Sequence, residues 1–215
     1  FLLLDGAFLA ANALKIAHGG WLPLVVGGAI MTLMLIWIWG RKRLYQRMMA
    51  GALPVSDLLS ELSKGKIHRV SGTAVYMNGK DTRVPTALLH NLKHNQVLHQ
   101  QVILLHVSTT DEPHATGPER IIHEDLGEGF HRITLQFGFA DSPAVPLALK
   151  QLLPEALHFN PGKATYFLGR ETYGVGKNAG IFDRARLFLF AIMARNASAA
   201  TAYFQLPPGR VVALG

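Results

Sequence analysis

Two histidines four residues apart are the first side chains in this sequence whose spacing could support chemistry. His90 and His94 fall on one face of a helix predicted over residues 85–95, and His99 follows shortly after it. Two imidazoles at this spacing can hold a metal ion. However, the sequence shows no third and fourth ligand, and no glutamate stands beside His90 as a zinc hydrolase motif requires. The pattern therefore favours hydrogen-bonding histidines at a domain or subunit contact, and we predict no metal site.

A glycine-rich segment is the second candidate. Residues 173–180 hold three glycines and Lys177 after a short predicted strand, an arrangement that could cradle a phosphate. The segment lacks the Gly-Lys-Ser/Thr ending of a P-loop and the spacing of a dinucleotide fingerprint, so a surface loop is the better interpretation. No serine sits in a nucleophile elbow, and His106 and His123 lie in or beside strands, where a structural role is expected. The sequence predicts no catalytic residue, no cofactor and no enzyme.

The chain around these residues begins with a long apolar segment. Residues 21–39 contain no charge, and Thr32 carries their one polar side chain outside the tryptophans. A helix of this length rises roughly 28 Å, close to the thickness of a bilayer's hydrocarbon core. Trp21 at one end and Trp37 and Trp39 at the other lie where indole rings favour the headgroup region. We therefore predict a membrane helix over residues 21–39.

A cluster of basic residues follows this helix directly. Four of them form what we call the basic belt: Arg41, Lys42, Arg43 and Arg47. Basic residues stay on the cytoplasmic side, so the helix should end in the cytoplasm with the belt facing anionic lipid. Residues 40–70 hold seven basic and two acidic side chains, which is +5 of the net charge of +7. With so little charge left for the rest of the chain, we expect no nucleic-acid partner.

The residues before this helix look like the end of another membrane segment. Residues 1–17 are mostly apolar but include Asp5, Asn12 and Lys15, and an outside turn is expected at His18, Gly19 and Gly20. A carboxylate at membrane depth is a functional suspect, although pairing of Asp5 with protein neighbours is the simpler interpretation. The chain begins with Phe1 and shows no signal peptide, so we interpret it as a fragment. It has no cysteine, which excludes disulfides and thiolate chemistry.

The rest of the chain predicts one α/β domain. We expect residues 1–40 to end the membrane region, residues 41–66 to form a basic helical linker with Ser56 capping a short helix, and residues 67–215 to form a cytosolic domain. Strands and helices alternate in that domain, which indicates a mixed sheet with helices packed on it. In chain order we predict strand 69–77, helix 85–95, strand 101–107, hairpin arms 119–125 and 130–139, helix 142–153, strand 164–169, helix 182–195 and strand 210–214. The core of this order is similar to a split βαβ arrangement.

Several blocks of residues occur in an order typical of one protein family. The first part of the chain contributes Asp5, Ala11-Asn12, Lys15-Ile16 and residues 19–24. The domain contributes residues 72–76, 90–95, 97–99, 102–105, 195–196, 204–208 and 210–212. With these blocks, the chain resembles the Kup family of bacterial potassium uptake proteins over essentially its whole length. One departure is Ser71, where proline is expected, and it should change only the entry to a strand.

The resemblance implies a transporter that moves K⁺ inward together with H⁺ in the bacterial inner membrane. In such folds the ion sites lie at broken helices near the midplane, which here would lie upstream, so no ion-pathway residue is assigned to this chain. The implied partners are potassium ion, proton and membrane lipids. The cytosolic domain is expected to regulate transport, with a small ligand as one means, or to form a homodimer. The alternative is a membrane-tethered ligand-binding or sensor module.

Overall fold

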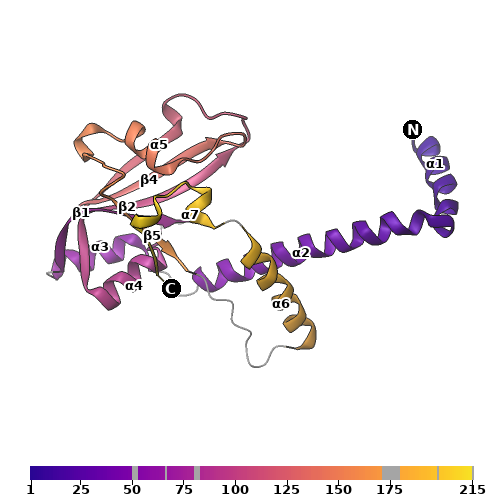
Figure 1. Ribbon diagram of the computed structural model, residues 1–215, viewed down its shortest axis with the longest axis horizontal. Coiled ribbons are helices and arrows are strands. Elements are labelled where there is room, and N and C mark those ends of the chain that lie inside the picture. Colours follow the sequence, from indigo (N-terminus) through magenta and orange to yellow (C-terminus); the bar gives the residue numbers. More distant parts are fainter. Residues whose placement is uncertain (50–52, 66, 80–82, 171–179, 198, 215) are drawn as a thin grey trace. The chain divides into compact units, whose positions relative to one another are not determined.

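The computed structural model describes residues 1–49, 53–65, 67–79, 83–170, 180–197 and 199–214. The chain forms two compact units, one of residues Phe1–Arg47 and Tyr173–Ala197 and the other of residues Met48–Thr172 and Ser198–Gly215. Figure 1 shows the elements of both units along the chain. This grouping places residues 181–196 with the N-terminal helices. The division predicted from the sequence, with a domain over residues 67–215, stays a prediction.

The first unit is helical. It contains α1 (Leu2–Lys15), the short π-helical segment η1 (Ile16–Gly20), α2 (Trp21–Met49) and α6 (Ile181–Asn196). The helical geometry breaks at His18 and at Gly19, whose φ of 112° lies in the region that favours glycine. The predicted turn at residues 18–20 is therefore confirmed as a kink between α1 and α2. Asp5 lies in the first turn of α1, where its charge complements the helix dipole.

Helix α2 runs without interruption from the apolar segment into the basic belt. Its apolar side chains are largely exposed, and the hydroxyl of Thr32 donates a hydrogen bond to the carbonyl of Gly28 at 2.8 Å. This bond satisfies the polar group inside the helix. Within the described part of the chain, His18–Gln46 is the one helical stretch long and apolar enough to cross a membrane. Only 6% of its most apolar window is buried, unlike the core helix of a soluble protein.

The second unit is built on a mixed sheet. Within the described residues the sheet has six strands in the order β3-β4-β2-β1-β5-β6. Their bounds are β1 His68–Asn78, β2 Val97–Thr110, β3 Ile121–Gly127, β4 Phe130–Gly138, β5 Thr165–Gly169 and β6 Val211–Leu214. Strand β3 pairs antiparallel with β4 through the predicted hairpin turn, and every other neighbouring pair is parallel. The predicted α/β class with a mixed sheet is confirmed.

The split βαβ arrangement is wrong. Strand β1 pairs directly with β2 in parallel, from His68 opposite Val97 to Asn78 opposite His106, and no strand lies between them. The connection between them contains α4 (Thr86–Asn95), so β1, α4 and β2 form a simple crossover unit. The order of strands and helices along the chain agrees with the prediction, but that order alone does not determine which strands become neighbours.

Helices cover both faces of this sheet. On one face α3 (Val55–Lys64) and α4 pack on Ala74, Tyr76 and Leu104. On the other, α5 (Val145–Leu152) packs on Val75, Ile103 and Ile133. Alternate residues of β1 and β2 thus enter different cores, and the central position predicted for residues 101–107 is confirmed. The remaining short helices are η2 (Pro118–Arg120), η3 (Glu155–Leu157), α7 (Ala200–Tyr203) and η4 (Pro208–Arg210).

Two predicted helix starts are wrong. Pro54 occupies the N-cap position of α3, and the hydroxyl of Ser56 instead donates to the carboxylate of Asp57 at 3.2 Å. Proline fixes φ in the range that a chain entering a helix needs, so the helix begins two residues earlier than an N-cap at Ser56 would place it. Helix α5 begins at Val145 rather than at Ser142, because residues 142–144 form tight turns before it.

Candidate functional site

The basic belt occupies the last turns of α2. The guanidinium of Arg43 lies 5.3 Å from the centre of the Trp39 ring, and Arg186 of α6 lies 4.7 Å from the centre of the same ring. Lys42 is exposed, and so is the side chain of Arg41. The side chain of Arg47 lies outside the described set. The apolar segment thus ends at an indole ring with guanidinium groups on it, a geometry suited to a headgroup region.

Helix α6 packs against α2 at the end of the apolar segment, where Trp37 and Trp39 lie. The rings of Trp37 and Phe190 lie 5.5 Å apart between centroids, and Phe190 is buried. Gly40 makes this contact possible, because a Cβ atom there would clash with the Phe190 ring. The contact therefore depends on a glycine at the border between the apolar segment and the basic belt.

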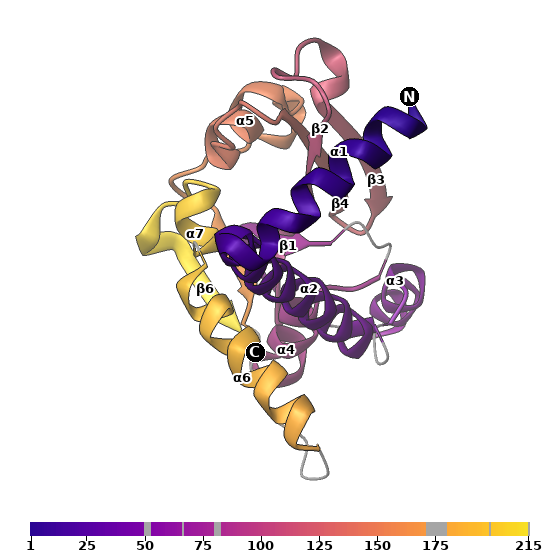
Figure 2. The ribbon, with the colours of Figure 1, turned by 90° about the vertical axis from the view of Figure 1, so that its right-hand side faces the viewer.

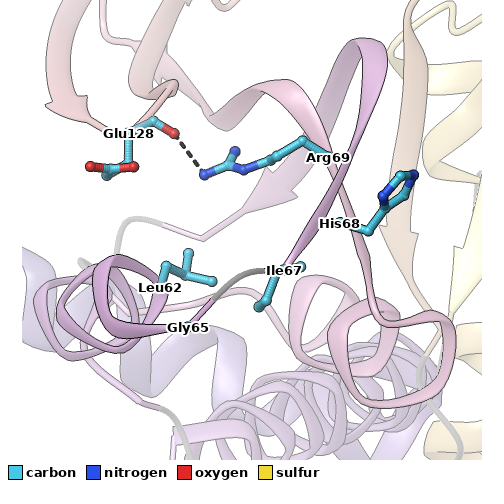
Figure 3. A pocket seen from close by; sticks show the side chains of 6 residues that line it. All are labelled: Leu62, Gly65, Ile67, His68, Arg69 and Glu128. Atoms are coloured by element: carbon cyan, nitrogen blue, oxygen red, sulfur yellow. Dashed lines mark hydrogen bonds between the residues drawn. The ribbon is translucent and has the colours of Figure 1, made fainter.

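A cavity of the sheet domain has a volume of about 560 Å³ and opens beside the start of β1. It is lined by Leu62, Gly65, Ile67, His68, Arg69 and Glu128 (Figure 3). The guanidinium of Arg69 donates to the carbonyls of His99 at 3.1 Å and Glu128 at 2.9 Å. In Figure 3 the carboxylate of Glu128 points away from Arg69. Because carbonyls and not carboxylates hold this cation in the described structure, it keeps the capacity to attract an anion.

A smaller cavity, of about 280 Å³, lies beside the loop after β2. Its lining carries three carboxylates, Asp111, Glu112 and Glu119, against one guanidinium, Arg120. The carboxylate of Asp141 fastens the neighbouring loop: it accepts hydrogen bonds from His114 Nδ1 at 2.7 Å and from the amides of Ala115 at 3.0 Å and Gly138 at 2.8 Å. The His114 bond first, and then the two amides, lower the pKa of Asp141 to about 2.

We expect Asp141→Asn to lower the stability of the sheet domain at neutral pH and to leave it almost unchanged in strong acid. A carboxyl whose pKa is lower in the folded state stabilises the fold above its unfolded pKa of about 4. That contribution disappears as the pH falls through the folded value of about 2. Thermal unfolding of wild type and variant, followed by circular dichroism at several pH values, measures the loss of stability at neutral pH and its disappearance in acid. A difference between wild type and variant that is independent of pH would contradict the assignment.

The predicted histidine candidates do not form one site. His90 and His94 share a face of α4 as predicted, with their rings stacked 5.8 Å apart. His99 lies instead in β2 with its ring 6.0 Å from that of Phe167, and its burial lowers its pKa. The described residues contain no group of three or more side chains able to hold a metal ion. In the glycine-rich candidate, residues 173–179 lie outside the described residues.

One cluster of ionisable groups was missed by the sequence analysis. His123 Nε2 and His131 Nδ1 lie 3.3 Å apart, and Asp125 lies 3.7 Å from His131. Burial of His131 is the main reason why its pKa is lowered, and the positive charge of a protonated His123 adds to it. Pairing the two predicted hairpin arms about Gly127 and Gly129 would have brought these residues together. The arrangement can share one proton, and it lacks further ligands for a metal.

Comparison with known families defines the class of protein. Residues 1–42 match the family model described as the K⁺ potassium transporter integral membrane domain. Residues 71–215 match the model described as the K⁺ potassium transporter C-terminal domain. The two matches follow each other along the chain, with the first ending inside the basic belt. The apolar helix therefore matches the membrane domain of the potassium transporter family, and the sheet domain matches the C-terminal domain of the same family.

The chain belongs to the Kup family of potassium transport proteins, so the resemblance in sequence is confirmed. It is 43% identical to a probable potassium transport system protein, Kup 1, of Geobacter sulfurreducens, and 46% identical to the probable Kup protein of Pseudomonas putida KT2440. The probable Kup protein of Myxococcus xanthus is 44% identical. Each comparison covers the whole chain but only 34%, 34% and 33% of the relative, respectively, so the chain spans about a third of their length. No solved structure matches the chain.

Proposed function

We propose that this chain is the C-terminal portion of a potassium uptake protein, in which α2 crosses the bacterial inner membrane and the sheet domain lies in the cytoplasm. The exposed apolar helix that ends in the basic belt carries the proposal. Exposed apolar side chains are favourable in lipid, and the belt fixes the direction by the positive-inside rule. The match of residues 1–42 to an integral membrane domain supports the same arrangement.

The transported species are proposed to be K⁺ and, by coupling, H⁺. One membrane helix cannot enclose a path for a dehydrated ion, and ion sites in such folds form between several broken helices. The pathway is therefore assigned to membrane helices outside this chain, and the chain itself should transport nothing. Potassium flux through liposomes that contain only this chain would contradict that assignment.

A chimera tests the function directly. The corresponding C-terminal third of the Pseudomonas putida relative, which is 46% identical, is replaced by this chain. In cells that lack other potassium uptake systems, the chimera should restore growth at low potassium and the uptake of rubidium as a tracer. Rubidium entry should alkalinise the medium if a proton enters with each ion. A chimera that is inserted at the wild-type level but moves no rubidium would count against the proposal.

The sheet domain is proposed to regulate transport or to stabilise a homodimer. The cavity at Arg69 favours the regulatory role, and it also keeps the second candidate function, a membrane-tethered ligand-binding module, in consideration. Calorimetric titration of the chain with a panel of nucleotides tests both. Binding that Arg69→Gln weakens would support a regulatory ligand. Absence of binding, together with a dimer in light scattering, would support the scaffolding role.

We expect neutralisation of the four belt residues to glutamine to leave α2 with a mixed orientation. Without the belt, the nearest basic residue is Lys15, which lies before the start of α2. The excess of basic residues that sets the orientation therefore moves from the C-terminal end of the apolar segment to its N-terminal end. A C-terminal fusion to a fluorescent protein, and in parallel to alkaline phosphatase, reports the side on which the domain lies. Fluorescence should fall and phosphatase activity should rise.

The control for this prediction removes equal charge from the sheet domain. Four basic residues are replaced by glutamine: Lys150, Lys163, Arg170 and Arg210. They lie far along the chain, where charges have little effect on topology, so the reporters should keep their wild-type values. An orientation that is unchanged in both variants would mean that the belt does not set the direction of α2.

A further inference from the structure

Helix α6 carries an apolar face that the described residues leave uncovered. Phe182 and Phe188 are 87% and 64% exposed, and Ile192 is 41% exposed. Ile181 and Leu189 complete the same face, with exposed fractions of 83% and 38%. Residues 181, 188, 189 and 192 repeat at the spacing of a single helical stripe. Exposure of two phenylalanines and three aliphatic side chains on one short helix is costly in water, so this face is expected to have a partner.

Arginines border this face. Arg184, Arg186 and Arg195 are exposed, against one acidic residue, Asp183, which the helical spacing places on the opposite side. A helix with an apolar stripe of large side chains and arginines along its borders is typical of helices that lie in a membrane interface, because the long arginine side chains can reach the phosphates from there. The charge on α6 has the same sign as the basic belt, and the two lie close together because Arg186 and Arg43 contact the same Trp39 ring.

The position of α6 within its own unit agrees with this property. Its contacts to α2 are made with Trp37 and Trp39, at the end of the apolar segment. Figure 1 shows α6 at a steep angle to α2 rather than running along it, and Figure 2 gives a second view of the same two helices. A helix that crosses a membrane-spanning helix lies along the plane of the bilayer, and here it does so at the depth of the indole rings.

We propose that α6 binds the anionic phospholipid surface of the cytoplasmic leaflet, with its apolar face among the upper acyl chains and its arginines at the phosphates. This inference rests on the proposed function, because it requires α2 to span the membrane. Lipid is favoured over a second copy of the chain because two copies meeting at this face would bring two belts and two sets of arginines together. Phosphate groups neutralise that charge, and a second copy adds to it.

The absence of cysteine allows a clean test on the whole chain. Single-cysteine variants Phe188→Cys and Ile192→Cys sample the apolar face, Asp183→Cys samples the opposite side of α6, and Ile30→Cys samples the middle of the apolar segment of α2. Each variant is spin-labelled and reconstituted into vesicles of phosphatidylcholine mixed with phosphatidylglycerol. Collision rates with oxygen, which concentrates in lipid, and with a water-soluble nickel chelate then give the depth of each label.

We expect the labels at 188 and 192 to collide mainly with oxygen and the label at 183 mainly with the chelate. Collision of the first two mainly with the chelate, while the label at 30 stays lipid-exposed, would overturn this inference and leave the proposed function standing. Protection of the labels at 188 and 192 from both reagents would also overturn it, in favour of a protein partner. Collision of the label at 30 with the chelate would instead refute the membrane span itself.

A second measurement tests the charge. In wild type, the label at position 188 should lie deeper in vesicles with phosphatidylglycerol than in vesicles without it. Arg184→Gln combined with Arg195→Gln should remove most of this difference in depth. The matched control, Lys150→Gln combined with Lys163→Gln, removes the same charge from the sheet domain and should retain that difference. If both double variants behave alike, anionic lipid is not the ligand of α6.

Discussion

Replacement of Phe130 by alanine is expected to destabilise the sheet domain by about 3 to 5 kcal/mol. Phe130 is completely buried at the start of β4, and it belongs to the core that residues of α3 and α4 form with the sheet. The guanidinium of Arg69 rests 5.5 Å from the ring centre, so the ring also supports one wall of the larger cavity. The loss is a large share of a typical domain stability of roughly 5 to 15 kcal/mol.

The strand is also fixed tightly at this point, which limits how far the structure can close the space left by the ring. Gly129, immediately before Phe130, has a φ of 75°, and its carbonyl accepts a hydrogen bond from the amide of Val102 at 2.8 Å. A Cβ atom at Gly129 would collide with the carbonyl of Gln100, so glycine is needed there. Because β4 is held to β2 by this close approach, the cavity should remain open and its full cost should appear.

The measurement must separate the two units, since each can unfold by itself. All three tryptophans lie in α2, so tryptophan fluorescence reports the membrane helix and not the sheet domain. Denaturant unfolding of the chain in detergent, followed by hydrogen exchange of peptides from β2 and β4, isolates the sheet. Phe130→Ala should accelerate exchange in both strands while the fluorescence stays unchanged.

Tyr166→Phe is the matched control in the second core. Tyr166 is completely buried, and within the described structure its hydroxyl has no hydrogen-bond partner, so burial raises its pKa to about 12. Removal of a buried hydroxyl that makes no hydrogen bond removes a desolvation cost, so the change in stability should be near zero or favourable. Equal destabilisation by both variants would mean that the cavity at Phe130 is not what the measurement detects.

Most elements of the sheet domain were predictable because their signals are local. Proline at the start of α4, the continuous apolar run of β2 and the glycines of the β3–β4 turn each mark an element within a few residues. The neighbour relations of the strands were not predictable in the same way. Two strands buried on both faces, such as β1 and β2, show nearly the same pattern whether they pair directly or enclose a third strand between them.

The candidate sites also differ in whether local sequence signals predict them. The basic belt is contiguous in sequence, so its position at the end of α2 follows from the order of the residues. The cavity at Arg69 joins residues 62–69 to Glu128, and the pair of His123 and His131 depends on the register of a hairpin. The contact of α6 with Trp37 joins residues more than a hundred positions apart. The cavity and the contact of α6 have no local sequence signal, whereas the two histidines could have been found by pairing the predicted hairpin arms.

Introduction of an aspartate at Ile30, in the middle of α2, is expected to prevent stable insertion of the helix. A carboxylate at the bilayer centre costs about 3 kcal/mol on insertion scales, where isoleucine contributes favourably, so the ratio of inserted to non-inserted chains should fall about 100-fold. Alkaline extraction of isolated membranes measures the fraction of chains that remain inserted. Wild type should stay in the membrane pellet, and most of the Ile30→Asp variant should appear in the supernatant.

Ile38→Asp provides a control of the same residue type and nearly equal exposure, 61% against 54% for Ile30. Ile38 lies between Trp37 and Trp39, where an ionised group can reach water, so the cost should be small and the variant should stay inserted. This pair separates a membrane helix from a helix in water, because only lipid makes the cost depend on depth. If both aspartates were tolerated equally, α2 would be a helix exposed to solvent. If both were equally disruptive, its surface would be buried against protein along its whole length.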